Sequence, residues 1–224
     1  MFNSQERKLE RMLSGHADTL SGAAYNAIMV ATLLYGFVVN AVMVVLFADS
    51  VSGIENPIPL LIGYLVSCLL GSFLAASDKP VMSFLGYNLI VLPMGVLLCA
   101  IIPGYGMGLV MSAIVITGAV TLIIGAISCI FPQVFLSMGR ALLTCLLVGC
   151  VLSVVSWFVL GLQEILVYAF TILYMLYLGY DLQKAQLYPK TVDNAIDSAI
   201  DLYLDIINLF LRILRILAKI RRDD

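Results

Sequence analysis

Residues 174–215 read YMLYLGYDLQKAQLYPKTVDNAIDSAIDLYLDIINLFLRILR, and this stretch places two carboxylates in apolar surroundings. Asp181 lies where one hydrophobic run nears its end, and Asp205 lies inside the next run, between Leu204 and Ile206. An ionisable group at membrane depth costs about 3 kcal/mol on insertion scales, and such groups usually mark a functional site. Both aspartates are therefore candidate site residues.

The composition of the chain indicates an integral membrane protein. Of the 224 residues, 62% are hydrophobic and 12% are charged, and the mean hydropathy is +1.06. A soluble domain carries about twice that share of charged residues. The single histidine, His16, precedes the first apolar run, which excludes a histidine-based triad or metal cluster within the membrane. The five cysteines make no CxxC and are interpreted as small core hydrophobes.

Seven apolar runs suggest membrane spans, each of which needs about 20 residues. We predict an all-α membrane protein with a seven-helix transmembrane domain over residues 23–218. A cytoplasmic N-terminal segment, 1–22, precedes it, and a charged tail, 219–224, follows it. The predicted spans cover residues 25–48, 57–76, 81–102, 107–131, 141–160, 165–180 or a little beyond, and 199–217. If Asp181 and Asp205 are to meet, the sixth helix must extend beyond residue 180 or the seventh must begin outside the membrane, as its polar start at Asp193 allows.

The basic residues alternate between the ends of these spans. They precede the first span and follow the second, fourth and sixth, whereas the connections after the first, third and fifth spans have none. Because basic residues accumulate on the cytoplasmic side, this pattern predicts a cytoplasmic N-terminus. The residues concerned are Arg7, Lys8, Arg11, Lys79, Arg140, Lys184 and Lys190.

The seventh span conflicts with this alternation. It is the least apolar span, and five basic residues stand within and after its C-terminal half, from Arg212 to Arg222. A full crossing would put them outside, so the charge count favours an incomplete crossing. The alternative is that the seventh helix crosses fully and is surrounded by the other six. Such a helix is shielded from lipid and can carry carboxylates.

The motifs GYDLQ around Asp181 and LYLDIINLFLRILR around Asp205 resemble those of the transmembrane Bax inhibitor motif family. The resemblance is most specific over the last fifth of the chain and rests upstream on the number and spacing of helices. It implies a seven-helix bundle with an acidic seventh helix at its centre. It also implies that Asp181 and Asp205 form the family's pH-sensing aspartate pair. Two close carboxylates cannot both ionise cheaply, so such a pair titrates as a unit.

The resemblance implies a pH-sensitive cation leak channel, with calcium as the ion, in the bacterial cytoplasmic membrane. Carboxylate oxygens suit calcium, so Asp181 and Asp205 are also the candidate metal contacts. We expect no resident cofactor, no enzymatic activity and no nucleic-acid partner; the lipid bilayer, calcium and protons are the expected partners. The alternatives are a non-conducting membrane regulator of stress responses or partner proteins, and a proton-coupled transporter. An intramembrane aspartyl protease is disfavoured because LYLD stands where that class needs GxGD.

The chain departs from the family at two positions. Some bacterial members have an arginine near the end of helix two that pairs with the aspartates, but residues 71–83 here read GSFLAASDKPVMS. Lys79 is the candidate latch partner in its place. Asp201 adds a carboxylate one turn before Asp205, and with Asn208 it is a candidate for the ion pathway. Asp193 and Asp197 are interpreted as a solvated helix start.

Overall fold

The computed structural model describes residues 19–51, 58–77, 79–159 and 161–223. Within these ranges the chain is helical and has no strand. It divides into two compact units. The first takes the described residues up to Gly104 together with Leu187–Asp201, and the second takes Tyr105–Gln186 and Leu202–Asp224. The long last helix contributes to both units.

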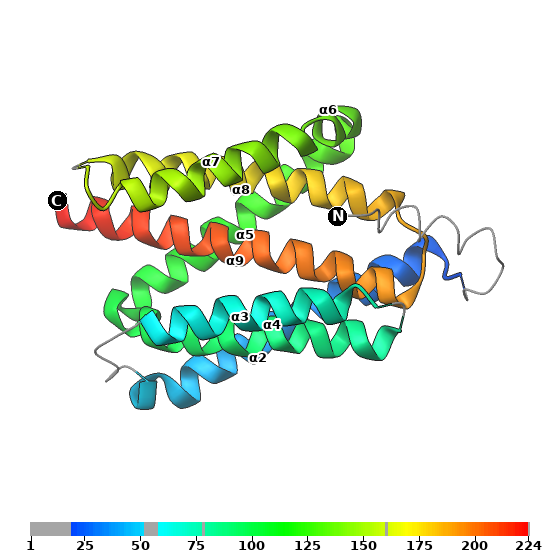
Figure 1. Ribbon diagram of the computed structural model, residues 1–224, viewed down its shortest axis with the longest axis horizontal. Coiled ribbons are helices and arrows are strands. Elements are labelled where there is room, and N and C mark those ends of the chain that lie inside the picture. Colours follow the sequence, from blue (N-terminus) through cyan, green and yellow to red (C-terminus); the bar gives the residue numbers. More distant parts are fainter. Residues whose placement is uncertain (1–18, 52–57, 78, 160, 224) are drawn as a thin grey trace. The chain divides into compact units, whose positions relative to one another are not determined.

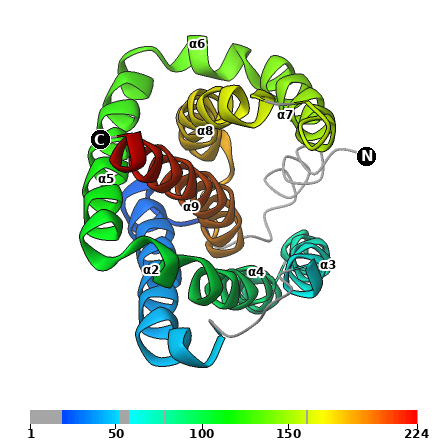
Figure 2. The same ribbon diagram turned by 90° about the vertical axis from the view of Figure 1, so that its left-hand side faces the viewer.

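The first unit is built from three apolar helices and the start of the last helix. They are α2 (Gly22–Val51), α3 (Ile58–Ala75), α4 (Pro80–Ile101) and the first turns of α9 (Val192–Asp223). Helices α3 and α4 lie side by side (Figure 2). Gly71 and Gly86 permit this approach, because a Cβ on Gly71 would come within 2.6 Å of the Gly86 carbonyl oxygen. Small residues at such crossings let membrane helices pack closely.

The second unit contains the remaining helices and the greater part of α9. They are α5 (Met107–Ile130), the short α6 (Pro132–Ser137), α7 (Gly139–Val155) and α8 (Leu162–Leu187), and the 3₁₀ turn η1 (Ile102–Tyr105) leads into α5. Helices α7 and α8 lie side by side (Figure 1). Leu142 of α7 packs there with Leu166, Phe170 and Leu173 of α8 in one buried cluster.

Five helices are long and apolar enough to cross a membrane: α2, α3, α4 with η1, α5 and α8. Their outward side chains are large and apolar; Val45, Phe73 and Leu122, for example, are 79%, 80% and 77% exposed. Exposing such large apolar faces to water is unfavourable, whereas the hydrocarbon of a lipid bilayer solvates them. The described residues therefore form an all-helical protein with at least five candidate spans.

The remaining two predicted spans do not meet this criterion. α7 has 17 residues, because residues 156–159 form turns instead of continuing the predicted span to residue 160. α9 is not among the candidate spans, and its sequence interleaves carboxylates with apolar residues. A seven-span topology stays a prediction.

The last two helices extend beyond the apolar spans. α8 continues to Leu187, past residue 180, and α9 begins at Val192, beside the polar start expected at Asp193, and runs to Asp223, past the predicted tail boundary at 218. The helices therefore continue past the residues where the hydropathy falls. The predicted N-terminal segment lies outside the described residues up to residue 18, as does the predicted start of span two at Pro57.

The cysteine interpretation is correct only in part. Cys99 is buried and Cys68 is intermediate, but Cys129, Cys145 and Cys150 are exposed. All three stand on apolar helices, so a small, weakly polar side chain suits the outer face of a membrane helix as well as its core.

Candidate functional site

The two predicted aspartates are both buried, on the last two helices. Asp181, on α8, is 8% exposed, and Asp205, on α9, is 6% exposed. Both belong to the second unit. On α8, Asp181 follows Leu178 and Gly179, which are also buried. The Gly179 Cα lies against the ring of Phe135, where no larger side chain would fit. This contact with α6 fixes the last turns of α8 and with them the position of Asp181.

Lys184 forms an ion pair with Asp181 that sequence reasoning had not identified. The Lys184 Nζ lies 3.2 Å from the Asp181 Oδ1, one turn along α8. The same ammonium lies 5.8 Å from the centre of the Tyr180 ring. An i,i+3 Asp–Lys spacing is a recognised helical pairing, so the signal was present in the sequence. Asp181 therefore has a cationic neighbour on its own helix.

Tyr177 connects the two aspartates electrostatically. Its phenol lies within range of both the Asp181 and the Asp205 carboxylates. Tyr177 stands one turn before Asp181 on the same face of α8. Both carboxylates thus act electrostatically on the same phenol of α8 within the second unit.

Arg212 lies two turns beyond Asp205 on α9 and was not predicted as a site residue. Its guanidinium lies 4.7 Å from the centre of the Phe170 ring. It also acts electrostatically on the Tyr174 side chain, as Asp205 does. Arginine stacks readily on aromatic rings because its guanidinium is planar and weakly hydrated. A half-buried cation therefore follows the buried carboxylate along the same helix contact.

A polar bridge between α5 and α8 holds the segment that carries Asp181. The Gln183 Nε2 donates a hydrogen bond of 3.0 Å to the Ser128 Oγ. Gln183 is 8% exposed and Ser128 is fully buried. Hydrogen bonds between polar side chains stabilise helix contacts in membranes by about 0.6–2 kcal/mol. Gln183 is therefore a positioning residue for this end of α8.

The other predicted site residues are Asp201, Asn208 and Lys79. Asp201 is half-buried one turn before Asp205, at the end of the chain segment assigned to the first unit. Asn208 is half-buried and donates from its Nδ2 to the Leu204 carbonyl oxygen of its own helix at 2.7 Å. Lys79 is exposed at the N-cap of α4 in the first unit. The pathway roles of Asp201 and Asn208 and the latch role of Lys79 stay predictions.

The start of α9 is packed, which corrects one expectation. Asp193 is 7% exposed, so its interpretation as a solvated helix start is wrong. The buried Tyr25 hydroxyl explains this, because it contacts the Ser198 Oγ at 2.8 Å and donates to the Asn194 carbonyl oxygen at 3.3 Å. Lys190 covers the Tyr25 ring at 4.2 Å, and burial lowers the pKa of its ammonium.

The sequence matches one protein family over almost its whole length. A family model described as "Inhibitor of apoptosis-promoting Bax1" matches residues 20–223. The chain belongs to the Bax inhibitor family. The match covers the upstream helices as well as the last two, so the resemblance inferred from GYDLQ and LYLDIINLFLRILR is confirmed over nearly the whole chain.

Two proteins from Helicobacter pylori are similar to this member of the family over 127 residues. Both carry the description "Uncharacterized protein"; the one from strain J99 is 34% identical and the one from strain 26695 is 33% identical. The match covers 54% of this chain and 53% of each relative. The chain thus spans about half the length of the curated relatives it matches.

No group of three or more histidine, cysteine, aspartate or glutamate side chains suited to a metal ion occurs among the described residues. Asp181 and Asp205 are two carboxylates and so fall below that number. Their predicted contact with calcium stays a prediction.

Proposed function

We propose that this Bax inhibitor family protein is a pH-sensitive cation leak channel, with calcium as the ion, in which protonation of Asp181 and Asp205 controls the flux. The observation that carries the proposal is the burial of two carboxylates, one on α8 and one on α9, that both act electrostatically on the Tyr177 phenol. Buried carboxylates are costly in a membrane protein and are expected to serve a purpose.

The neighbours of the pair support a proton-dependent contact between the two helices. When ionised, Asp181 is held by the Lys184 ammonium at 3.2 Å. Protonation removes the negative charge on which that ion pair depends. Asp205 has Tyr177 and Tyr174 as polar neighbours on α8. A change in the shared protonation of the pair would therefore alter the contacts between α8 and α9 at this level.

The charges along α9 support a cation as the permeant species. Asp193, Asp197, Asp201 and Asp205 recur every four residues over the first half of the helix. Carboxylate oxygens are the ligands that hard cations such as calcium prefer. Rings or rows of acidic side chains are the usual selectivity device of cation channels. On this proposal the row attracts cations toward Asp205.

Calcium flux into liposomes containing the purified protein tests the proposal. We expect a calcium indicator inside the vesicles to respond to external calcium, with a rate that depends on pH. Empty vesicles supply the control. Absence of flux at every pH would contradict the proposal and favour the non-conducting regulator. Calcium accumulation against its gradient would instead identify a proton-coupled transporter.

A further inference from the structure

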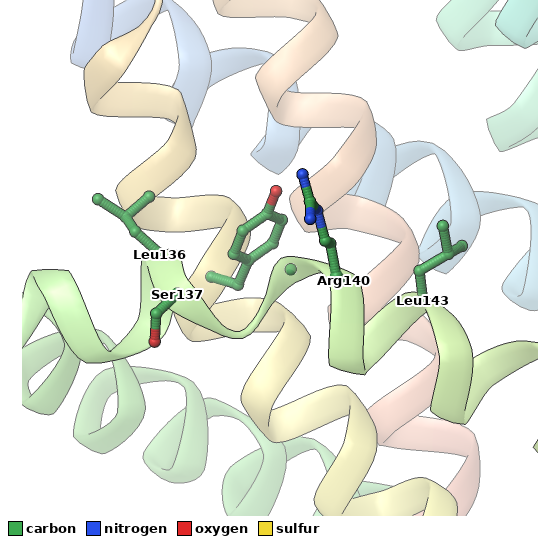
Figure 3. A pocket seen from close by; sticks show the side chains of 6 residues that line it. Leu136, Ser137, Arg140 and Leu143 are labelled. Carbon is green, nitrogen blue, oxygen red and sulfur yellow. The ribbon is translucent and has the colours of Figure 1, made fainter.

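A surface cavity of about 560 Å³ lies in the second unit, where α6 meets α7 and the side of α8. Leu136, Ser137, Gly139, Arg140, Leu143 and Tyr180 line it (Figure 3). The Gly139 Cα lets the Tyr180 side chain approach, because a Cβ there would come within 2.7 Å of the Tyr180 hydroxyl. The chain therefore brings a phenolic hydroxyl of α8 to the first turn of α7, beside Arg140.

The cavity combines one cation with apolar walls. Arg140 is exposed, and its guanidinium makes no hydrogen bond or ion pair with the residues that the structure describes. Its side chain and that of Leu136 point to the same side of the α6–α7 segment, whereas Ser137 points to the other side (Figure 3). The Ser137 hydroxyl is also engaged, since it donates to the Val134 carbonyl oxygen at 2.7 Å. Arg140 and Tyr180 are therefore the polar groups available to a ligand.

If α7 crosses the membrane, as the sequence predicts, its length places this cavity at the level of lipid headgroups. After Arg140, the residues of α7 up to Val155 carry no charge. Its 17 residues span about 26 Å, close to the thickness of a hydrocarbon core of about 30 Å. At the far end Trp157 and Phe158 are 77% and 85% exposed, as aromatic residues at a membrane interface often are. Arg140 thus stands at the opposite interface.

We propose that this cavity binds the phosphate of an anionic phospholipid headgroup. The Arg140 guanidinium can offer two parallel N–H donors to the phosphate oxygens, and the Tyr180 hydroxyl a third donor. Leu136 and Leu143 supply the apolar edge against which the glycerol and the first acyl carbons lie. Arginine suits this task better than lysine because its planar fork matches a phosphate. The site does not depend on calcium flux and holds whether or not the protein conducts.

Lipid retention by the purified, detergent-solubilised protein tests this site. Native mass spectrometry would follow added phosphatidylglycerol and phosphatidylcholine with the same acyl chains. We expect one phosphatidylglycerol to be retained in preference to phosphatidylcholine. Arg140→Gln should weaken that retention about fivefold or more, as for the loss of a charged hydrogen bond. Arg140→Lys should give an intermediate loss, and Tyr180→Phe a smaller one. Arg215→Gln, which removes an exposed arginine elsewhere in the same unit, should have no effect.

Equal retention of the two lipids, or retention unchanged by Arg140→Gln and Arg140→Lys, would overturn the proposal. So would displacement of phosphatidylglycerol by inorganic phosphate at millimolar concentration with the same dependence on Arg140, because the site would then be one for free phosphate. Preference for phosphatidylglycerol that Arg140→Gln abolishes, Arg140→Lys weakens and Arg215→Gln leaves unchanged supports it.

Discussion

At the scale of single residues, the ion pair between Lys184 and Asp181 sets the electrostatics of one predicted sensor residue. The two groups lie 3.2 Å apart, and the Lys184 side chain is 23% exposed. Water therefore screens the pair in part, and its contribution is that of a partly exposed ion pair, at most about 1 kcal/mol. Lys184 stabilises the ionised form of Asp181.

Replacing Lys184 by methionine tests this pairing. The stem of the side chain is kept and the charge is lost, so Asp181 takes up its proton more readily. We expect the pH midpoint of calcium flux to move upward by about half a unit. Lys184→Arg, which keeps the charge, is the matched control and should leave the midpoint near that of the parent. A midpoint that Lys184→Met does not move would exclude Lys184 as a partner of the sensor.

The sequence predicted the buried aspartates but not their surroundings. Apolar neighbours on both sides of Asp205 are visible in LYLDIIN, and the i,i+3 spacing of Asp181 and Lys184 was also visible. The contact of Arg212 with Phe170 joins residues on two helices, which no local pattern encodes. The burial of Asp193 likewise depends on Tyr25, far upstream in the chain, reaching the first turns of α9.

At the scale of elements, α9 orders its charges along its length. Asp201 stands one turn before Asp205, and Arg212 stands two turns after it. If cations follow this helix, the carboxylates lower the free energy of a cation and the guanidinium raises it. Neutralising Asp201 and neutralising Arg212 should therefore change the calcium flux in opposite directions.

Asp201→Asn tests whether the carboxylate one turn before Asp205 belongs to the cation pathway. If Asp201 and Asp205 together contact a passing divalent cation, the substitution should reduce calcium flux at fixed pH by several-fold. It should shift the pH midpoint little, because Asp181 and Asp205 are untouched. Flux that is unchanged at every calcium concentration would remove Asp201 from the pathway.

Arg212→Gln tests whether cations pass the guanidinium two turns after Asp205. Losing the half-buried guanidinium should raise calcium flux by several-fold, because an unfavourable charge for a divalent cation is removed. Arg215→Gln, at an exposed position three residues later, is the control and should change flux little. Equal flux in the parent and Arg212→Gln would show that cations do not pass this residue. Thermal unfolding of both variants in detergent would show whether the contact with Phe170 is also needed for stability.

Hydropathy was a good guide to where helices exist and a poor guide to where they end. The five candidate spans are runs in which outward-facing and core-facing positions are both apolar. α8 outlasts its apolar run because Leu182, Gln183 and Ala185 still pack within the second unit. The apolar span predicted at 199–217 is shorter than α9 because a helix that interleaves carboxylates with apolar residues has a low average hydropathy.

At the scale of the whole molecule, the alternation of basic residues predicts a cytoplasmic N-terminus, and the position of the C-terminus is open. Ser4→Cys should react with a membrane-impermeant thiol reagent only after the cells are permeabilised, because basic residues favour the cytoplasmic side. The parent chain, with its five cysteines, supplies the background. Labelling of Ser4→Cys in intact cells would contradict the topology. Asp224→Cys in the same assay decides whether the seventh predicted span crosses fully.

The pH response of Asp205→Asn tests the central claim most directly. The amide nearly preserves the shape of the buried carboxylate but cannot take up or release a proton at physiological pH, so the pair loses its shared titration. In proteoliposomes loaded with a calcium indicator, we expect the flux of Asp205→Asn to change little across mildly acidic pH. The parent and the control Asp49→Asn, which replaces an exposed carboxylate at the end of α2, should keep the full pH response. A full pH response in folded Asp205→Asn would contradict the account.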